Sequence, residues 1–523
     1  MPAPTVGNGE KSDKYSEGRA YSAVRSLARF AIWAYFRNCH VSVLGNVPKE
    51  SPMLVAGNHL NMVLDPSVLI VTVPHNRQLH FWALARFFNI PVIGRIFSAV
   101  GVLPVDTKTR SNAKLFESTV DCLGHDQAVA VFPEGKFCFV IPRTWINLTK
   151  SPDVAGTSYT APHHLPFKDG LSWAAYEFLS QQHERRQRGE PAPYHYVTVL
   201  PVGITYTTKD KWRSDVIVQY AKPITVDEED RKRFLDDPKA TVKSLTNRIT
   251  ESIEQATINA PDWDTDNAMA TARNILFGHR NGIQLQNYVK ISQSLVNILH
   301  PLKIPKYAEL STLKSRLLSF SRTTQLLQLS DQDIAVYQKE KISILTATLR
   351  LLRISLKLLI ELPLFLPGLI FHSPVYALGK VAESVEKFTE SVAQDKIALA
   401  LGLLVPLYST LFYQIWKYTN FSFGGFILGA ILIPTFARYH MSMLDKRYDL
   451  AKDLVAAWRI FVALTGGKSQ RAEVEEAVEL RKWCAEQLKT LLLRLKDEGN
   501  EDATFLVEQA RTFFNEGTAP VLE

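Results

Sequence analysis

Cysteine is scarce in this chain, with only four in 523 residues. They are Cys39, Cys122, Cys138 and Cys484, which are too widely spaced to form a CxxC pair or a cluster of metal ligands. This distribution argues against structural zinc and indicates a reducing compartment around the thiols. We therefore predict a protein without a metal site.

Signatures of nucleic-acid binding are also missing, since neither zinc-finger spacing nor an RNA-binding motif occurs. The net charge is nevertheless +8. Such a balance suits a surface that meets anionic membranes, phosphate-bearing substrates or nucleic acid, and the last of these has the weakest support. No cleavable signal peptide is visible, and the polar residues 1–20 predict a disordered N-terminus.

Residues 21–226 predict an α/β domain. Hydrophobic residues make up 46% of the chain and charged residues 21%, which is the composition of a folded protein. Strand-like apolar runs alternate with helical patterns, which predicts a mixed, partly parallel sheet flanked by helices. The main strand candidates are residues 53–56, 127–132, 196–206 and 215–220, and residues 101–110 read as a strand that leaves into a basic loop.

Two aromatic-rich stretches of this domain each allow two structural interpretations, one packed on the protein and one in contact with a membrane. Residues 21–36 carry apolar side chains at helical spacing between arginines. They fit a basic amphipathic helix on a membrane surface or a helix that covers the sheet. Residues 79–101 fit core helices or an element that leans into lipid.

The second half of the chain predicts helices and a membrane region. Residues 227–345 read as charged helices that pack on the α/β domain. Residues 346–440 contain two uncharged runs, 397–416 and 421–437, which predict a transmembrane hairpin. The basic residues that flank this hairpin place its outer ends in the cytosol. A third run, 362–378, contains three prolines and favours a broken, re-entrant or interfacial element over a clean span. Residues 441–523 predict C-terminal helices.

Residues 54–66, LVAGNHLNMVLDP, bring a histidine and an aspartate together. The apolar run before them predicts a strand, and Pro66 predicts the first turn of a helix. His59 and Asp65 thus fall in a strand-to-helix connection, where open α/β folds often place chemistry. A histidine acting as a base needs such a carboxylate partner. Taken singly, Asp65 also fits a helix N-cap, and His59 a structural histidine.

Four blocks follow in order: His59 with Asp65, GVLPVDT (101–107), FPEGK (132–136) and LPVGITY (200–206). Together they resemble the glycerol-phosphate acyltransferase superfamily. The stretches NHLNMVLDP, LPFKDG and KWRSDVIVQYAKPI are similar to the fungal-type membrane enzymes that acylate glycerol 3-phosphate and dihydroxyacetone phosphate. So are PDWDT (261–265), FHSPV (371–375) and DLVAAWR (453–459), and the resemblance covers about residues 20–465.

Two details of these blocks depart from the commonest superfamily pattern. Five residues separate His59 from Asp65, where four are usual, and the dual-substrate subfamily is similar in having five. FPEG is followed by Lys136 and an apolar run, where Thr, Ser or Arg is usual. The first departure favours the subfamily, and the second leaves the substrate-side geometry open.

The chemistry that this resemblance implies is direct acyl transfer without a cofactor. His59 would take the proton from an sn-1 hydroxyl as that hydroxyl attacks an acyl-CoA thioester, and Asp65 would orient the imidazole. The acceptor phosphate would need cations. Glu134 and Gly135 would shape the pocket and support a positive group. The cation candidates are Lys136 and Lys168, followed by Arg213 and by Lys108 and Arg110, for which an ordinary surface charge is the preferred interpretation.

The resemblance thus implies an acyl-CoA-dependent glycerol-3-phosphate 1-O-acyltransferase that also uses dihydroxyacetone phosphate. It would catalyse the first step of glycerophospholipid and triacylglycerol synthesis in the endoplasmic-reticulum membrane, with a cytosolic catalytic domain. Its partners would be acyl-CoA, the phosphate acceptor and membrane lipids. Two alternatives remain open: a lysophospholipid acyltransferase, for example of lysophosphatidate, and a membrane lipid-binding scaffold with a degenerate site.

Overall fold

The chain forms two compact units, which are described separately. The computed structural model describes residues 18–105, 113–135, 161–278, 282–300, 302, 307, 309–339, 343–386, 389–466 and 468–516. The first unit, here called the sheet unit, comprises Met1–Thr160, His164–Thr257 and Glu386–Ile397. The second, here called the helical unit, comprises Ala161–His163, Ile258–Val385 and Ala398–Glu523.

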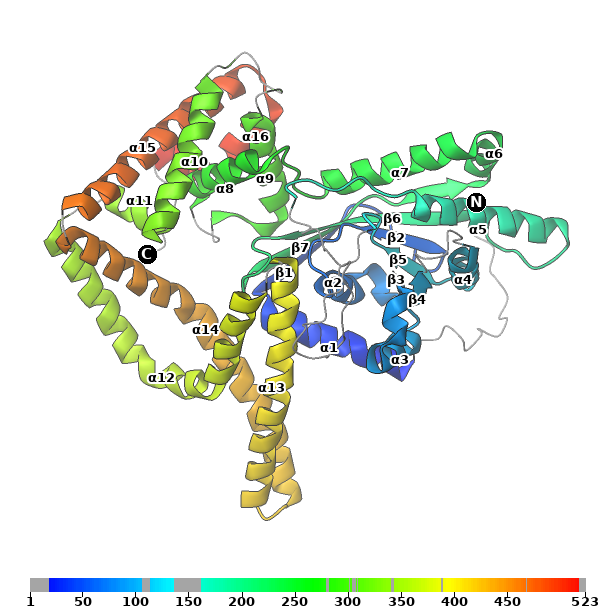
Figure 1. The fold of residues 1–523 in the computed structure, drawn as a ribbon, viewed down its shortest axis with the longest axis horizontal. Helices are drawn as coiled ribbons and strands as arrows, with labels where there is room; N and C mark the ends of the chain where they lie inside the picture. Colours follow the sequence, from blue (N-terminus) through cyan, green and yellow to red (C-terminus); the bar gives the residue numbers. More distant parts are fainter. Residues whose placement is uncertain are drawn as a thin grey trace. The chain divides into compact units, whose positions relative to one another are not determined.

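An eight-stranded mixed sheet organises the sheet unit (Figure 1), which confirms the predicted fold class. The strand order is β1-β7-β6-β2-β5-β3-β4, and β8 pairs with β6. Strand β2 is parallel to β5 and β6, whereas β6 is antiparallel to β7 and β8. The strands are β1 (Asn38–Val43), β2 (Met53–Gly57), β3 (Leu79–Leu84), β4 (Leu103–Val105), β5 (Ala128–Val131), β6 (Tyr196–Tyr206), β7 (Asp215–Tyr220) and β8 (Ile224–Asp227).

Helices cover both faces of this sheet. Met53 and Val55 of β2 enter one core and Leu54 and Ala56 the other, because successive side chains of a strand point to opposite faces. The first core includes residues of helices α1 (Arg19–Tyr35) and α2 (Leu64–Thr72). The second includes residues of α4 (Ala113–Leu123), α5 (Gly170–Gln187) and α7 (Pro238–Gln255). The central strands are therefore apolar on both sides.

Helix α1 covers the sheet with one face and exposes an apolar face on the other. Ile32 and Tyr35 enter the core, and the hydroxyl of Tyr21 accepts a hydrogen bond from the Leu79 amide at 2.8 Å. Leu27 is 53% exposed and Trp33 is 43% exposed. The helix begins at Arg19, so residues 19 and 20 belong to it and not to a disordered N-terminus. Residues 1–17 lie outside the described part of the chain.

Two further predictions for the sheet unit were wrong. Residues 79–84 form strand β3 instead of a helix, because their apolar side chains fill both faces of the sheet; they are followed by helix η3 (Ala85–Asn89) and α3 (Pro91–Ala99). The predicted boundary at residue 226 is also too early. Helices α6 (Glu228–Asp236) and α7 belong to the sheet unit, and α7 places Leu245 and Ile253 in its second core.

The helical unit has a core to which helices far apart in sequence contribute. Residues of α8 (Trp263–Phe277), α9 (Leu285–Leu299), α10 (Glu309–Leu327) and α11 (Asp331–Lys339) pack with residues of α15 (Lys468–Asp497) and α16 (Glu501–Gln509). The middle helices therefore share their core with the C-terminal helices, which the sequence had not indicated. Helix α17 (Arg511–Glu516) follows.

Helix α12 (Ile344–Val385) is one continuous helix despite Pro363, Pro367 and Pro374. The expectation that these prolines break it was wrong. Each proline removes a backbone N–H and strains the carbonyl four residues earlier. Side chains bond carbonyls along this stretch: the Ser373 hydroxyl donates to Ile370 O at 2.8 Å, and the Tyr439 hydroxyl donates to Leu364 O at 2.9 Å. The helix is bent but unbroken (Figure 1).

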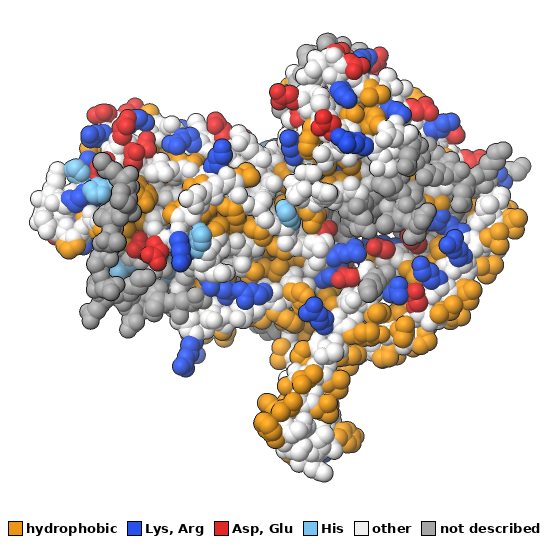
Figure 2. Space-filling model, turned by 180° about the vertical axis from the view of Figure 1, so that it is seen from behind, with side chains coloured by type: hydrophobic (Ala, Val, Ile, Leu, Met, Phe, Trp, Pro, Cys, Tyr) orange, Lys and Arg blue, Asp and Glu red, His pale blue; other side chains and the backbone are white. Residues whose placement is uncertain are grey.

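Helices α13 (Thr389–Tyr418) and α14 (Phe423–Thr465) form the predicted hairpin around a turn at Thr419–Ser422. Within the described residues, α12, α13 from Ser391 and α14 are the three helices long and apolar enough to cross a membrane. Their surface is unusual for a water-facing one, since hydrophobic side chains cover it along α12 and the hairpin (Figure 2).

Candidate active site

The candidate site lies at the carboxyl ends of three neighbouring parallel strands. β2 ends at Gly57 and is followed by Asn58 and His59, and β5 ends at Val131, just before the FPEG block. β6 lies on the other side of β2 and ends at Tyr206. Because the carboxyl ends of parallel strands meet at one edge, residues about 150 positions apart are brought together, as open α/β sheets commonly do.

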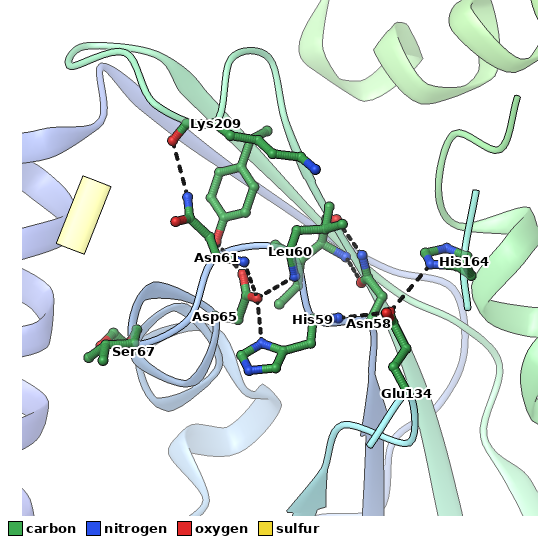
Figure 3. Close-up of polar contacts among 12 residues, drawn as sticks. Asn58, His59, Leu60, Asn61, Asp65, Ser67, Glu134, His164 and Lys209 are labelled. Carbon is green, nitrogen blue, oxygen red and sulfur yellow. Dashed lines mark hydrogen bonds and ion pairs between the residues drawn. The ribbon is translucent and has the colours of Figure 1, made fainter. Parts of the chain in front are cut away.

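His59 and Asp65 form a direct pair, as the sequence predicted. His59 Nδ1 lies 2.8 Å from Asp65 Oδ2 (Figure 3). The carboxylate accepts, so Nδ1 carries the proton and Nε2 is left as the basic nitrogen. The His59 side chain is 13% exposed and Asp65 is fully buried. The histidine is thus held in the tautomer that a general base needs.

Four donors hold the Asp65 carboxylate. Besides His59, the amides of Leu60 and Asn61 donate to Oδ2 at 2.6 and 2.7 Å, and the Tyr206 hydroxyl donates to Oδ1 at 2.6 Å. These bonds compensate the burial of its charge. Asp65 is the second residue of α2, where a carboxylate also favours the helix dipole. The N-cap position is occupied by Val63, so the N-cap interpretation of Asp65 was wrong.

Tyr206 remains a donor at neutral pH. Burial raises the pKa of the Tyr206 phenol well above its usual value, and the negative charge of Asp65 raises that pKa further. Tyr206 therefore keeps its proton across the physiological range. Tyr206 ends the LPVGITY block, but no sequence pattern assigns it a role in the site. An aromatic residue in a buried strand is ordinarily a core residue.

The backbone before His59 is fixed by Asn58 and Glu134. Asn58 Nδ2 donates to Ile204 O at 2.9 Å, and Ile204 N donates to Asn58 Oδ1 at 2.7 Å, so the amide side chain extends the β2–β6 pairing. Glu134 Oε1 accepts the His59 amide at 3.1 Å (Figure 3). The His59 ring stacks on Phe132, with 4.3 Å between ring centroids. Backbone, ring plane and tautomer of His59 are thus all set by neighbours.

His164 supports Glu134 from the opposite side. Its Nδ1 lies 3.5 Å from Glu134 Oε1, and both side chains are buried, at 7% and 5% exposure. Its Nε2 lies 2.7 Å from the hydroxyl oxygen of Thr257, which follows α7. No pattern in the sequence singled out His164 as a site residue. Only the adjacent LPFKDG block hinted at this segment.

Lys168 wraps around the FPEG turn. Its amide donates to Pro133 O at 2.9 Å and its Nζ donates to Gly135 O at 2.8 Å. Gly135 has φ +61°, a left-handed backbone conformation that favours glycine at this turn. Nζ is exposed and retains further N–H donors for an anion. The structure thus places Lys168, Glu134 and Gly135 together beside His59.

Arg213 has a structural environment. It is 7% exposed, and its Nη1 donates to Trp33 O at 3.1 Å and Phe36 O at 2.7 Å, at the end of α1. These bonds satisfy carbonyls at a helix C-terminus, which a guanidinium commonly does. Lys108, Arg110 and Lys136, the other predicted cations, lie outside the described residues.

Chemically, this arrangement can accept a proton at His59 Nε2 and stabilise the resulting imidazolium through Asp65. In the described ranges of the chain, no group of three or more His, Cys, Asp or Glu side chains is placed to bind a metal ion.

A comparison with known sequence families shows which proteins this domain resembles. Residues 38–205 match the sequence model of the family described as Acyltransferase. That range holds His59, Asp65, Glu134 and Lys168. Residues 38–205 are therefore similar in sequence to the acyltransferase family.

Particular relatives narrow the comparison. Glycerol-3-phosphate O-acyltransferase 2 of Saccharomyces cerevisiae is 26% identical over 311 residues, covering 57% of this chain and 37% of the yeast protein. Glycerol-3-phosphate O-acyltransferase 1 of the same yeast is 21% identical over 502 residues, covering 78% of this chain and 64% of that protein. The chain thus spans less than two thirds of either relative. A crystal structure of the 1-acyl-sn-glycerophosphate (LPA) acyltransferase PlsC from Thermotoga maritima has a TM-score of 0.26 and 20% identity, covering 43% of this chain and 79% of that one.

Proposed function

We propose that this protein transfers an acyl group from acyl-CoA to the sn-1 hydroxyl of glycerol 3-phosphate, and also to dihydroxyacetone phosphate. The observation that carries the proposal is the His59–Asp65 pair, 2.8 Å apart, inside a domain that matches the acyltransferase family. The resemblance to two yeast glycerol-3-phosphate O-acyltransferases supports this choice of acceptor.

In the proposed reaction the acceptor hydroxyl is the nucleophile. His59 Nε2 takes its proton as the oxygen attacks the thioester carbonyl carbon. The C–O bond forms, the C–S bond breaks, and the departing CoA sulfur takes the proton from Nε2. Asp65 orients the ring and stabilises its transient charge. With glycerol 3-phosphate the products are lysophosphatidate and CoA, and no cofactor takes part.

Lys168 is the proposed contact for the acceptor phosphate. It lies on the FPEG turn, whose Glu134 touches the His59 amide. Charged N–H donors bind phosphate oxygens more strongly than neutral ones do. Lys136, next in sequence to Gly135, is proposed for the same role. Lys108, Arg110 and Arg213 stay as more distant candidates, and the bonds of Arg213 to α1 make it the weakest of the described ones.

The setting we propose is the endoplasmic-reticulum membrane with the sheet unit in the cytosol. The three apolar helices among the described residues support membrane attachment. Both an acyl-CoA and a lysophosphatidate are amphiphiles, so a catalyst held at a bilayer meets its donor and releases its product in the same phase. Membrane lipids are then the natural surroundings of the enzyme.

An acceptor competition assay tests this function. Membranes containing the protein are supplied with acyl-CoA and with glycerol 3-phosphate, dihydroxyacetone phosphate or lysophosphatidate. We expect transfer to the first two. Transfer to lysophosphatidate alone would overturn the proposal in favour of a lysophospholipid acyltransferase, and no transfer to any acceptor would favour the lipid-binding scaffold.

A further inference from the structure

Helix α12 raises a question of membrane topology that its composition does not answer. At 42 residues it is about 63 Å long by the rise of an α-helix, roughly twice the hydrocarbon thickness of a bilayer. It is one of the three candidate membrane helices in the described part of the chain. If all three crossed, the segments before α12 and after α14 would lie on opposite sides of the membrane.

The sheet unit gives the first constraint. It contains His164–Thr257, which precede α12, and Glu386–Ile397, which follow it directly. Ala393 is fully buried in the same core as Val216, and Lys396 Nζ donates to Asp210 O at 2.8 Å. One packed core lies on one side of a membrane, so residues 257 and 386 are on the same side. The number of crossings between them is even.

The helical unit gives an independent second constraint. Its core joins Ile334 of α11, before α12, with Leu488 and Leu492 of α15, after α14. Arg481 of α15 also forms a buried ion pair with Asp331, with Nε 2.8 Å from Oδ1. The number of crossings between residues 339 and 468 is therefore even as well.

Together the two constraints determine which two of the three candidate helices cross the membrane. Among the described residues between 257 and 386, α12 is the one candidate span, so an even number of crossings there is zero. α13 and α14 are then left as the crossing pair. Their short connecting turn suits a hairpin that enters and leaves by the same side.

The first half of α12 has the pattern of a helix that lies on a lipid surface. One stripe is apolar and largely exposed, and the stripe beside it is basic, both at spacings of three or four residues. The apolar stripe contains Leu345, Leu349, Leu352 and Leu356, with exposures from 57% to 68%. The basic stripe contains Arg353 and Lys357, which are exposed, whereas the partly buried Arg350 interacts with Asp333 and Asp453. Anionic headgroups complement such a basic stripe.

We infer that α12 does not cross the membrane: it lies against an anionic lipid surface on the side that holds both packed cores. The bend at its prolines turns the second half of the helix back without a break (Figure 1). Of the three candidate helices in the described part of the chain, α13 and α14 cross. This placement is independent of which acceptor the protein acylates.

Labelling of single cysteines in sealed vesicles tests the topology. The full-length chain carries Cys39→Ser and Cys138→Ser, which leaves buried Cys122 and Cys484. Probe cysteines are placed before α12, at its end and at the hairpin tip, at Leu326, Val385 and Tyr418, which are 86%, 64% and 85% exposed. We expect an impermeant maleimide to label both Leu326→Cys and Val385→Cys or to label neither, depending on which side of the membrane faces outward. Tyr418→Cys at the hairpin tip should show the opposite labelling, and after detergent is added all three should be labelled. Opposite responses at 326 and 385 would overturn the inference.

A second matched pair tests the lipid contact itself. Arg353→Cys and Leu356→Cys lie one turn apart on α12, on the basic and the apolar stripe. In vesicles sealed with the cores outside, we expect Arg353→Cys to label and Leu356→Cys to label only after detergent. Equal labelling without detergent would mean that the helix faces water, and loss of both would mean that it is buried in the bilayer.

If a cysteine variant does not fold, trypsin treatment of the natural chain in sealed vesicles replaces it. We expect cuts on both sides of α12 from the same compartment. A fragment in which α12 is protected at only one end would contradict the inference.

Discussion

At the residue scale, the buried carboxylate of Asp65 controls the candidate base. Asp65→Asn leaves a side chain with one acceptor oxygen for four donors and allows the wrong histidine tautomer. We predict that kcat falls by about 10²–10⁴-fold with little change in KM for acyl-CoA. Tyr206→Phe removes one of the four donors, at Oδ1, and should lower kcat less. Steady-state kinetics of both variants check this order, and a larger loss from Tyr206→Phe would contradict it.

His164 allows a sharper test, because asparagine and glutamine replace different nitrogens of the ring. His164→Asn keeps a donor near Nδ1, toward Glu134, whereas His164→Gln keeps one near Nε2, toward Thr257. If His164 positions Glu134, and through it the His59 amide, the asparagine variant should retain kcat. The glutamine variant should lose about 10-fold or more, since small displacements of a base are costly.

The alternative role for His164 is to pin its segment to the end of α7. Thr257→Val is the matched control, since it removes the Nε2 partner and leaves the Glu134 contact. A retained kcat in Thr257→Val supports positioning through Glu134. A loss there that equals a loss in His164→Asn, with His164→Gln retaining kcat, would indicate a purely structural pin. Unfolding temperatures of all three variants are measured alongside.

The His59–Asp65 pair could be predicted from the sequence, whereas the contacts of Tyr206 and His164 that support this pair could not. His59 and Asp65 are six positions apart, so their proximity follows from one strand-to-helix connection. Tyr206 and His164 reach the site only through the order of strands in the sheet and the path of a loop. No periodicity encodes those distances.

At the scale of elements, a single glycine lets α7 approach β6. A Cβ at Gly203 would lie 2.4 Å from Ala256 O, at the end of α7. We predict that Gly203→Ala destabilises the protein by about 1–3 kcal/mol through overpacking. Gly170→Ala, at the start of α5, meets only an ordinary 3.6 Å contact with Trp82 and should be neutral or stabilising.

Thermal unfolding of the two glycine variants gives the comparison. Equal unfolding temperatures would contradict the close packing of α7 on β6. The same pair shows why the sequence placed the domain boundary too early. One of the close contacts between α7 and the sheet is made at Gly203, which has no side chain, and hydrophobic patterning does not register such a contact.

The prolines of α12 illustrate a second limit of sequence reasoning at this scale. Three prolines in one helix ordinarily indicate a break. Here hydroxyls from Ser373 on the same helix and Tyr439 on α14 bond carbonyls of the stretch. Because one of these partners is more than 60 residues away in sequence, the pattern of α12 alone gave no sign of it.

At the scale of the whole molecule, the core of the helical unit depends on residues that precede the membrane helices in sequence and on residues that follow them. Arg481 and Asp331 are 2% and 9% exposed and are joined by two hydrogen bonds. Arg481→Ala would leave a buried carboxylate unpaired, which costs about 3–5 kcal/mol. Arg471→Ala breaks an exposed pair with Glu475 and should cost about 0.5 kcal/mol.

Unfolding measurements of both arginine variants in detergent check this difference. Similar losses would contradict a core shared by α11 and α15. The broad architecture at this scale, a mixed sheet followed by helices and an apolar hairpin, was predictable from composition and periodicity. The sharing of cores by distant segments was not, because it depends on packing between helices.

The most direct test of the central claim is acyl transfer to glycerol 3-phosphate by the wild-type protein and by His59→Ala in the same membranes. We predict that the wild type forms lysophosphatidate from acyl-CoA. In His59→Ala the rate should fall by about 10²–10⁴-fold, as for loss of a general base, while the protein stays membrane-bound. Transfer at the wild-type rate in His59→Ala would exclude His59 as the general base.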